Sequence, residues 1–138
     1  MMPSENNIRP RNILVADANA DFRALLCHYL DRLNYPAPIQ AQDGAEALSM
    51  ALALEPCLIL MEIRLPKMTG LEVVARLRND PSAREIWMVA ATAMALPGDR
   101  EKCLRSGFDD YLAKPFTLKE FDELLLTVST TRRNAAGY

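Results

Sequence analysis

The stretch Cys57-Leu58-Ile59-Leu60-Met61-Glu62-Ile63-Arg64-Leu65-Pro66-Lys67-Met68-Thr69-Gly70 is a continuous apolar run that ends abruptly at a carboxylate and continues into a turn-rich segment. A short, unbroken apolar run between turn signals is typical of a strand buried on both faces of a sheet. Glu62 is therefore expected at the carboxyl end of that strand. Apolar residues at helical spacing from Leu71 to Leu77 then predict a helix, which Asn79-Asp80-Pro81 stops.

The same strand-and-helix unit recurs outward from this stretch in both directions. Further strands are predicted at Ile13–Ala16, near Ile39–Ala41, at Ile86–Ala91 and near Asp110–Ala113. Further helices are predicted from Phe22 to Leu33, from Asp43-Gly44 to Glu55-Pro56, from Pro97-Gly98-Asp99 to a glycine cap at Ser106-Gly107, and from a capping box at Thr117 and Glu120 to Val128. Continuous apolar strands imply a parallel sheet with helices on both faces. We predict an α/β protein with a flavodoxin-like (βα)5 three-layer sandwich and a parallel five-stranded sheet of order 2-1-3-4-5.

Length, charge and composition indicate one ordinary globular domain. The chain has 138 residues, and we expect the domain at residues 11–130, between a flexible N-terminal extension, 1–10, and a flexible C-terminal tail, 131–138. The formal charge of −2 gives no support for a nucleic-acid or membrane partner. The sequence shows neither a signal peptide nor an apolar stretch of membrane-spanning length, so we expect a cytoplasmic protein.

Polar side chains are predicted at the edge of the sheet where the strands end, namely Asp17, Glu62, Thr92 and Lys114. In a doubly wound fold, ligands collect beyond the carboxyl ends of the strands. Two carboxylates, one hydroxyl and one ammonium can together hold an anion or a metal ion. Each residue alone has a simpler explanation, since Asp17 or Thr92 could cap a following helix. The combination is what predicts a site.

Motifs in a particular order and spacing resemble the receiver domains of response regulators, the CheY-like family. They are Ile13-Leu14-Val15-Ala16-Asp17, Asp43-Gly44-Ala45-Glu46-Ala47-Leu48, Leu65-Pro66-Lys67-Met68-Thr69-Gly70, Ala91-Thr92-Ala93 and Asp110-Tyr111-Leu112-Ala113-Lys114-Pro115-Phe116. The resemblance covers roughly Arg11 to Val128, which is nearly the whole chain. It implies a signalling module of a two-component or phosphorelay system that is not itself an enzyme.

The resemblance also assigns roles to individual residues. Glu62 stands at the phosphoacceptor position, and Lys114 matches the lysine that contacts the phosphate. Thr92 and Tyr111 match the hydroxyl and aromatic pair that changes arrangement on phosphorylation. The Lys114-Pro115 peptide bond is expected to be cis.

Magnesium in such receivers binds to a pair of acids after the first strand, to the phosphoacceptor, and to a backbone carbonyl. The matching positions here are Asp17 and Ala18, Glu62, and the carbonyl of Arg64. Ala18 lacks the second carboxylate, which leaves two carboxylates against Lys114 and a pocket charge of about −1 in place of about −2. We therefore expect magnesium binding to be weak or absent.

Glu62 also changes the phosphoacceptor, because the family carries aspartate at this position. One extra methylene moves the carboxylate by about 1.5 Å, and displacements near 1 Å can lower a rate on the order of a hundredfold. We expect phosphorylation of Glu62 to be very slow or absent. Its carboxylate is instead expected to pair with Lys114 or to accept a hydrogen bond from Thr92.

The residues leave several functional hypotheses open. The domain acts either as a docking module that is independent of phosphorylation or as a constitutive mimic of the phosphorylated state. Alternatives are a receiver with residual phosphoryl-accepting activity and bound magnesium, or a small phosphoryl-handling enzyme, which Ala18 and Glu62 oppose. The expected partner is a histidine kinase, a phosphotransfer protein or an output protein. It would bind the fourth helix, fifth strand and fifth helix, approximately Pro97 to Arg105, Asp110 to Ala113 and Thr117 to Val128.

Overall fold

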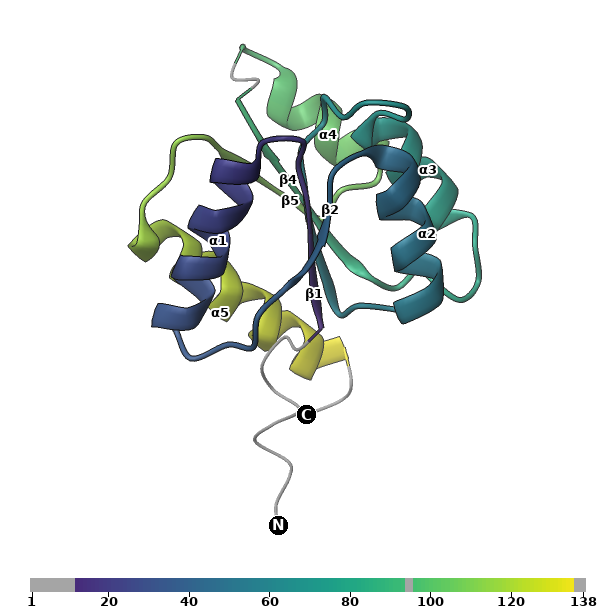
Figure 1. The fold of residues 1–138 in the computed structure, drawn as a ribbon. Helices are drawn as coiled ribbons and strands as arrows, with labels where there is room; N and C mark the ends of the chain where they lie inside the picture. Colours follow the sequence, from purple (N-terminus) through teal and green to yellow (C-terminus); the bar gives the residue numbers. More distant parts are fainter. Residues whose placement is uncertain (1–11, 94–95, 136–138) are drawn as a thin grey trace.

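Five parallel strands form the middle layer of the structure, a computed structural model that describes residues 12–93 and 96–135 (Figure 1). The strands are β1 (Ile13–Ala16), β2 (Ile39–Ala41), β3 (Leu58–Met61), β4 (Trp87–Thr92) and β5 (Asp110–Ala113). The helices are α1 (Ala20–Arg32), α2 (Gly44–Leu54), α3 (Gly70–Arg78), α4 (Asp99–Ser106) and α5 (Leu118–Ala135). The strand order is β2-β1-β3-β4-β5, which confirms the predicted flavodoxin-like topology.

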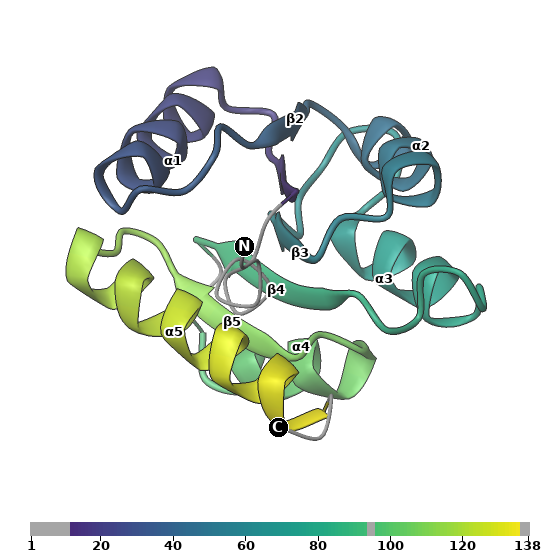
Figure 2. The ribbon, with the colours of Figure 1, turned by 90° about the horizontal axis from the view of Figure 1, so that it is seen from below.

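Helices cover both faces of the sheet. Figure 2 shows α1 and α5 on one face and α2, α3 and α4 on the other. Side chains of each strand alternate between the two faces, as the two-residue period of a strand requires. In β3, for example, Leu58 and Leu60 belong to the cluster under α1 and α5, whereas Ile59 and Met61 belong to the cluster under α2, α3 and α4. The unbroken apolar pattern of the strands is thus explained by burial on both sides.

Helix ends follow the signals in the sequence. The capping box at α5 is confirmed, since Thr117 Oγ1 accepts from the Glu120 N–H at 3.1 Å and Glu120 Oε1 accepts from the Thr117 N–H at 2.8 Å. A second capping box, between Thr69 and Glu72, begins α3 directly after the Glu62 loop. Gly107 ends α4 at a φ of 123°, the conformation for which glycine is favoured. The peptide bond between Lys114 and Pro115 is cis, as expected.

Three boundaries differ from the sequence-based expectation or fall outside the structure. β4 runs from Trp87 to Thr92, one residue later than predicted, because Trp87 is the first residue of this strand to pair with β3. The helix α5 continues to Ala135, so most of the segment expected as a flexible tail, 131–138, is helical. The expected N-terminal extension, 1–10, lies outside the described residues. Within the described ranges, no helix combines the length and the apolar character needed to span a membrane.

Candidate functional site

The four predicted site residues at the strand ends meet at the carboxyl ends of the strands. They are called the rim residues below and are Asp17, Glu62, Thr92 and Lys114. Asp17 follows β1, Glu62 follows β3, Thr92 ends β4 and Lys114 follows β5. Backbone hydrogen bonds continue the sheet one residue past the strands, because the Glu62 N–H donates to the Ala16 carbonyl at 3.0 Å and the Lys114 N–H donates to the Thr92 carbonyl at 2.9 Å. The sheet itself therefore fixes where these side chains start.

Lys114 lies between the two carboxylates. Its Nζ is 2.6 Å from Asp17 Oδ2 and 3.0 Å from Glu62 Oε1. The side chains of Asp17, Glu62 and Lys114 are only 5%, 11% and 18% exposed, so solvent screens these ion pairs less than it screens surface pairs. The ring of Phe22 adds a third contact, with the ammonium 4.0 Å from its centroid.

The Glu62 carboxylate is fully engaged by donors. Its Oε2 accepts from Thr92 Oγ1 at 2.5 Å, from the Ile63 N–H at 2.7 Å and from the Arg64 N–H at 3.3 Å. Its Oε1 accepts from Lys114. Burial opposes the charged form, but the hydrogen bond from Thr92 and the contacts with Lys114 outweigh it and lower the pKa of Glu62. The side chain is therefore held as an anion in one orientation.

The loop after β1 holds Asp17 in an equally defined place. Its Oδ1 accepts from the Asn19 N–H at 2.9 Å, and Asn19 in turn caps α1. Arg23 donates from Nη1 to the Asp17 carbonyl at 2.7 Å and from Nε to Gln40 Oε1 at 3.0 Å. Ala18, next to Asp17, is exposed and supplies no polar side chain.

Two glycines allow the Glu62 loop to pack against its neighbours. A Cβ on Gly70 would lie 2.6 Å from the Glu62 carbonyl oxygen, and one on Gly44 would lie 1.7 Å from the Met68 carbonyl oxygen. The same backbone segments are hydrogen-bonded, since the Gly70 N–H donates to Ile63 at 2.8 Å and the Gly44 N–H donates to Pro66 at 3.1 Å. The glycines of two sequence motifs thus bring α2 and α3 against the loop that carries Glu62.

The other two predicted site residues lie near this centre. Arg64 has an exposed side chain, and its backbone N–H is directed to Glu62. Tyr111, in β5, is partly buried and packs against the hydrophobic cluster under α2, α3 and α4. Burial first, and then the negative charge of Asp99 among other groups, raises the pKa of Tyr111, so its hydroxyl is neutral at physiological pH.

The donor set leaves a magnesium ion few free carboxylate oxygens. Magnesium takes a near-octahedral shell of oxygen ligands and favours carboxylates. Both carboxylates at the rim are already bonded to the Lys114 ammonium, and the second acid position is Ala18. Among the residues that the structure describes, no group of three or more His, Cys, Asp or Glu side chains could hold a metal. A divalent ion would compete with the ammonium for these carboxylate oxygens.

Sequence reasoning missed Phe22 and Arg23 as parts of the site. Helical spacing identified Phe22 only as an apolar residue of α1, and Arg23 gave no signal. Both lie in the first turn and a half of a helix that starts three residues after Asp17. A helix entering at the rim brings its first turns close to the loop after β1, and this is the signal that could have identified them.

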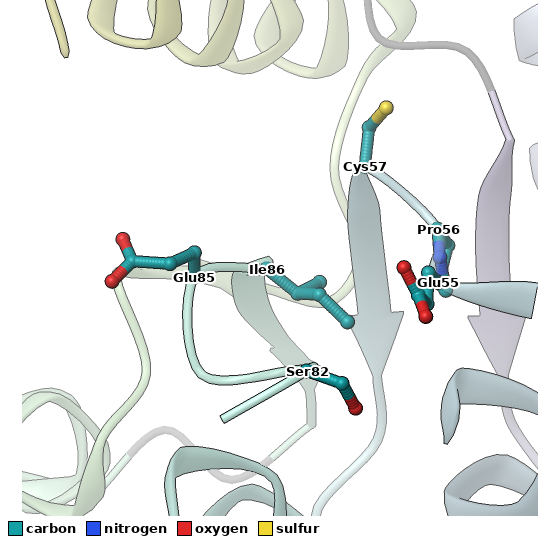
Figure 3. Close-up of a pocket in the computed structure, with 6 residues that line it drawn as sticks. All are labelled: Glu55, Pro56, Cys57, Ser82, Glu85 and Ile86. Carbon is teal, nitrogen blue, oxygen red and sulfur yellow. The ribbon is translucent and has the colours of Figure 1, made fainter. Parts of the chain in front are cut away.

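A hollow of about 150 Å³ lies at the amino ends of β3 and β4, opposite the carboxyl ends where the rim residues meet. Figure 3 shows its lining residues, which are Glu55, Pro56, Cys57, Ser82, Glu85 and Ile86. None of them belongs to the rim. This hollow is therefore separate from the predicted site.

Comparison with known proteins identifies relatives along almost the whole chain. The family described as "Response regulator receiver domain" matches residues 13–126. The polar-differentiation response regulator DivK of Brucella anthropi is 34% identical over 116 residues, which is 84% of this chain and 94% of DivK.

Solved structures agree with this match. The receiver domain of the sensor histidine kinase PA1611 of Pseudomonas aeruginosa PAO1, described with a magnesium ion coordinated in its active site cleft, superposes with a TM-score of 0.80 at 33% identity, covering 88% of this chain and 98% of that one. A chain from the co-crystal of the Saccharomyces cerevisiae phosphotransfer protein Ypd1 and the receiver domain of its downstream response regulator Ssk1 gives a TM-score of 0.79 at 26% identity, covering 90% and 92%.

Proposed function

Because this chain belongs to the response regulator receiver domain family of two-component signalling, we propose that it is a receiver whose output does not depend on phosphorylation. The observation that carries the proposal is the environment of Glu62. Its single carboxylate already engages Thr92 and Lys114, the residues assigned by family resemblance to the switch and to the phosphate contact. Glu62 thereby takes the place of the group that the phosphorylated family member would carry.

The chemistry of the site supports a loss of phosphoryl transfer. In the family, an aspartate carboxylate attacks the phosphorus of a phosphohistidine, and a lysine positions the transferred oxygens. Here Glu62 Oε2 accepts three hydrogen bonds and Oε1 accepts one from Lys114. Attack through Oε2 would break those hydrogen bonds, and attack through Oε1 would compete with its contact to Lys114. The lowered pKa of Glu62 also makes it a weaker nucleophile.

Of the two forms of this proposal, the contacts favour the constitutive mimic over the inert docking module. A mimic requires that a negative group draws the Thr92 hydroxyl toward the phosphoacceptor position, and Thr92 Oγ1 donates to Glu62 Oε2. It also requires Tyr111 to turn inward, which this form of the proposal predicts. A carboxylate has fewer oxygens and less charge than a phosphoryl group, so the mimicry would be partial.

Magnesium is proposed to bind more weakly than in receivers with a complete acid pair. The magnesium-bound receiver domain of PA1611 establishes the ion for that protein. In this chain Ala18 replaces one acid, and Lys114 neutralises part of the charge at Asp17 and Glu62. The proposed ligands for such weak binding are Asp17, Glu62 and the carbonyl of Arg64.

The proposed partner is a histidine kinase, a phosphotransfer protein or an output protein in the cytoplasm. The complex of Ypd1 with the Ssk1 receiver domain gives the precedent for contact between a similar receiver and a phosphotransfer protein. We propose the surface formed by α4, β5 and α5 for this contact. The output would then be delivered by binding in trans.

Intact mass spectrometry tests the central proposal. The native chain and an Ala18→Asp, Glu62→Asp double variant are incubated with magnesium and a small acyl-phosphate donor. We expect the double variant alone to gain the mass of one phosphoryl group. A phosphoryl group mapped to Glu62 in the native chain would overturn the proposal.

The mimic is tested separately by Glu62→Ala, which removes the acceptor of Thr92. We expect the NMR signals of Thr92 and Tyr111 to move together, since both would leave the arrangement held by Glu62. Unchanged signals at both residues would instead support the inert docking module. Ser49→Ala, an exposed substitution on α2, serves as the control.

A further inference from the structure

The aromatic ring of Phe22 closes the site from the side of α1. The Lys114 ammonium lies 4.0 Å from its centroid, while the two carboxylates hold that ammonium by hydrogen bonds. We propose that Phe22 is a positioning residue that fixes Lys114 between Asp17 and Glu62. The lysine then keeps its positive charge on the two carboxylates that an ion from solution would otherwise contact.

Phe22 is itself held in place on two sides. Its ring meets Phe116 edge to face, with centroids 5.7 Å apart and an interplanar angle of 86°. Its backbone N–H donates to the capping side chain of Asn19 at 3.0 Å. Because Phe116 follows Lys114 by two residues, the segment that carries the ammonium also carries a ring that orients Phe22. The contact between Phe22 and Phe116 thus helps to hold the ring against the Lys114 ammonium.

The ring adds an attraction that an aliphatic side chain cannot supply. The face of an aromatic ring is electron-rich and attracts a cation, and the effect increases where water is excluded. The Lys114 side chain is 18% exposed, so little water competes for the ammonium. An attraction of this kind corresponds to about a two- to thirtyfold preference for the bound position.

This inference rests on the proposed function, because a fixed ammonium matters most where no ion from solution is needed. A divalent cation competes with Lys114 for Asp17 Oδ2 and Glu62 Oε1, and detachment of the ammonium would free both oxygens for it. Phe22 increases the cost of that detachment without touching either carboxylate. Phe22 would therefore lower the magnesium affinity of the site. This effect would add to the loss of the acid at Ala18.

Hydrogen exchange of the Lys114 ammonium, measured by NMR, tests the positioning role directly. Exchange requires the ammonium to leave its partners and meet water. We expect Phe22→Leu to accelerate it about two- to thirtyfold, and Phe22→Tyr to keep it near the native rate because the ring is retained. Leu25→Ala, a partly exposed position on the same helix, is the control for general loosening of α1.

A magnesium titration followed through backbone amide signals gives the second readout. We expect Phe22→Leu to bind magnesium about two- to thirtyfold more tightly than the native chain, and Phe22→Tyr to match the native chain. Equal ammonium exchange in Phe22→Leu and the native chain would overturn the inference, and so would a Phe22→Tyr variant that behaves like Phe22→Leu. Neither readout involves phosphoryl transfer, so a failure here is distinct from phosphorylation of Glu62 in the mass assay.

Discussion

Arg78 and Lys114 each tie together one end of the sheet, but their partners differ in kind. Arg78, at the end of α3, donates to the backbone carbonyls of Gly107 at 2.9 Å, Arg84 at 2.7 Å and Ile86 at 2.7 Å. It also donates to a side chain, the Asp109 carboxylate, at 2.7 Å. Lys114, at the opposite end, is bound by the side chains of Asp17 and Glu62. The first arrangement fastens loops, whereas the second holds groups that rotamer changes can separate.

The difference shows what has changed at the rim. Side-chain partners are suited to a switch, because a ligand or a modification can replace any one of them. Here Lys114 donates to both carboxylates, and the Thr92 hydroxyl donates to Glu62. The rim therefore resembles the Arg78 end in being internally satisfied. Three substitutions can test this similarity, beginning with the largest expected effect.

Arg78→Ala should remove the hydrogen bonds that hold the loops at the amino ends of β4 and β5. Several backbone carbonyls and the Asp109 carboxylate would lose a charged donor, and we expect the free energy of unfolding to fall by about 2–4 kcal/mol. Urea denaturation measures the change. Arg76→Ala, at an exposed position of the same helix, should change stability by less than about 0.5 kcal/mol. Similar losses in the two variants would mean that the Arg78 contacts contribute little.

Lys114→Met should remove both ion pairs at the rim. It leaves Asp17 and Glu62 without their shared cation, and we expect a loss of about 1–3 kcal/mol at neutral pH. Added magnesium should recover more of this loss than it adds to the native chain, because the freed carboxylates become available to it. Lys119→Met, an exposed change in α5, is the matched control. A Lys114→Met variant that magnesium does not stabilise would argue against competition between the ammonium and the ion.

Glu62→Gln should produce the smallest change, and the change should diminish as the pH falls into the acid range. The pKa of Glu62 is lowered by folding, so its stabilisation is present above the usual glutamate value of about 4.3 and is lost as the pH falls through the folded value. We expect the stability of the native chain to decline more steeply below about pH 4.5 than that of Glu62→Gln. Urea denaturation across this range measures both slopes, with Glu85→Gln as the exposed control. Parallel curves would show that Glu62 does not titrate with folding.

Much of the fold follows from local signals. Apolar runs ending at Asp17 and Glu62 locate the carboxyl ends of two strands, and parallel pairing then brings those ends together. The Gly107 cap and the capping box at Thr117 were likewise readable, because each depends on a few adjacent residues. The rim could be predicted because it requires only strand ends in a known order.

The remaining features depend on contacts between distant segments. Phe22 is an ordinary apolar residue until β5 brings Lys114 and Phe116 to it. Arg78 looks like a favourable charge at a helix C-terminus, and only the packed loops before β4 and β5 reveal its carbonyl partners. The extension of α5 to Ala135 has no apolar pattern that would predict it. Such contacts have no local sequence signal.

The single tryptophan gives the molecule an optical reference for these comparisons. Trp87 begins β4 and Thr92 ends it, so the indole lies at the Arg78 end, about 16 Å along the strand from the rim. Its indole nitrogen is buried, and among the described residues it has no hydrogen-bond partner. Intrinsic fluorescence should consequently report loosening at the start of β4 while remaining insensitive to charge changes at Glu62. If a rim variant shifts the tryptophan emission, the substitution has disturbed β4. Its effects on stability or magnesium binding would then be attributed to that disturbance.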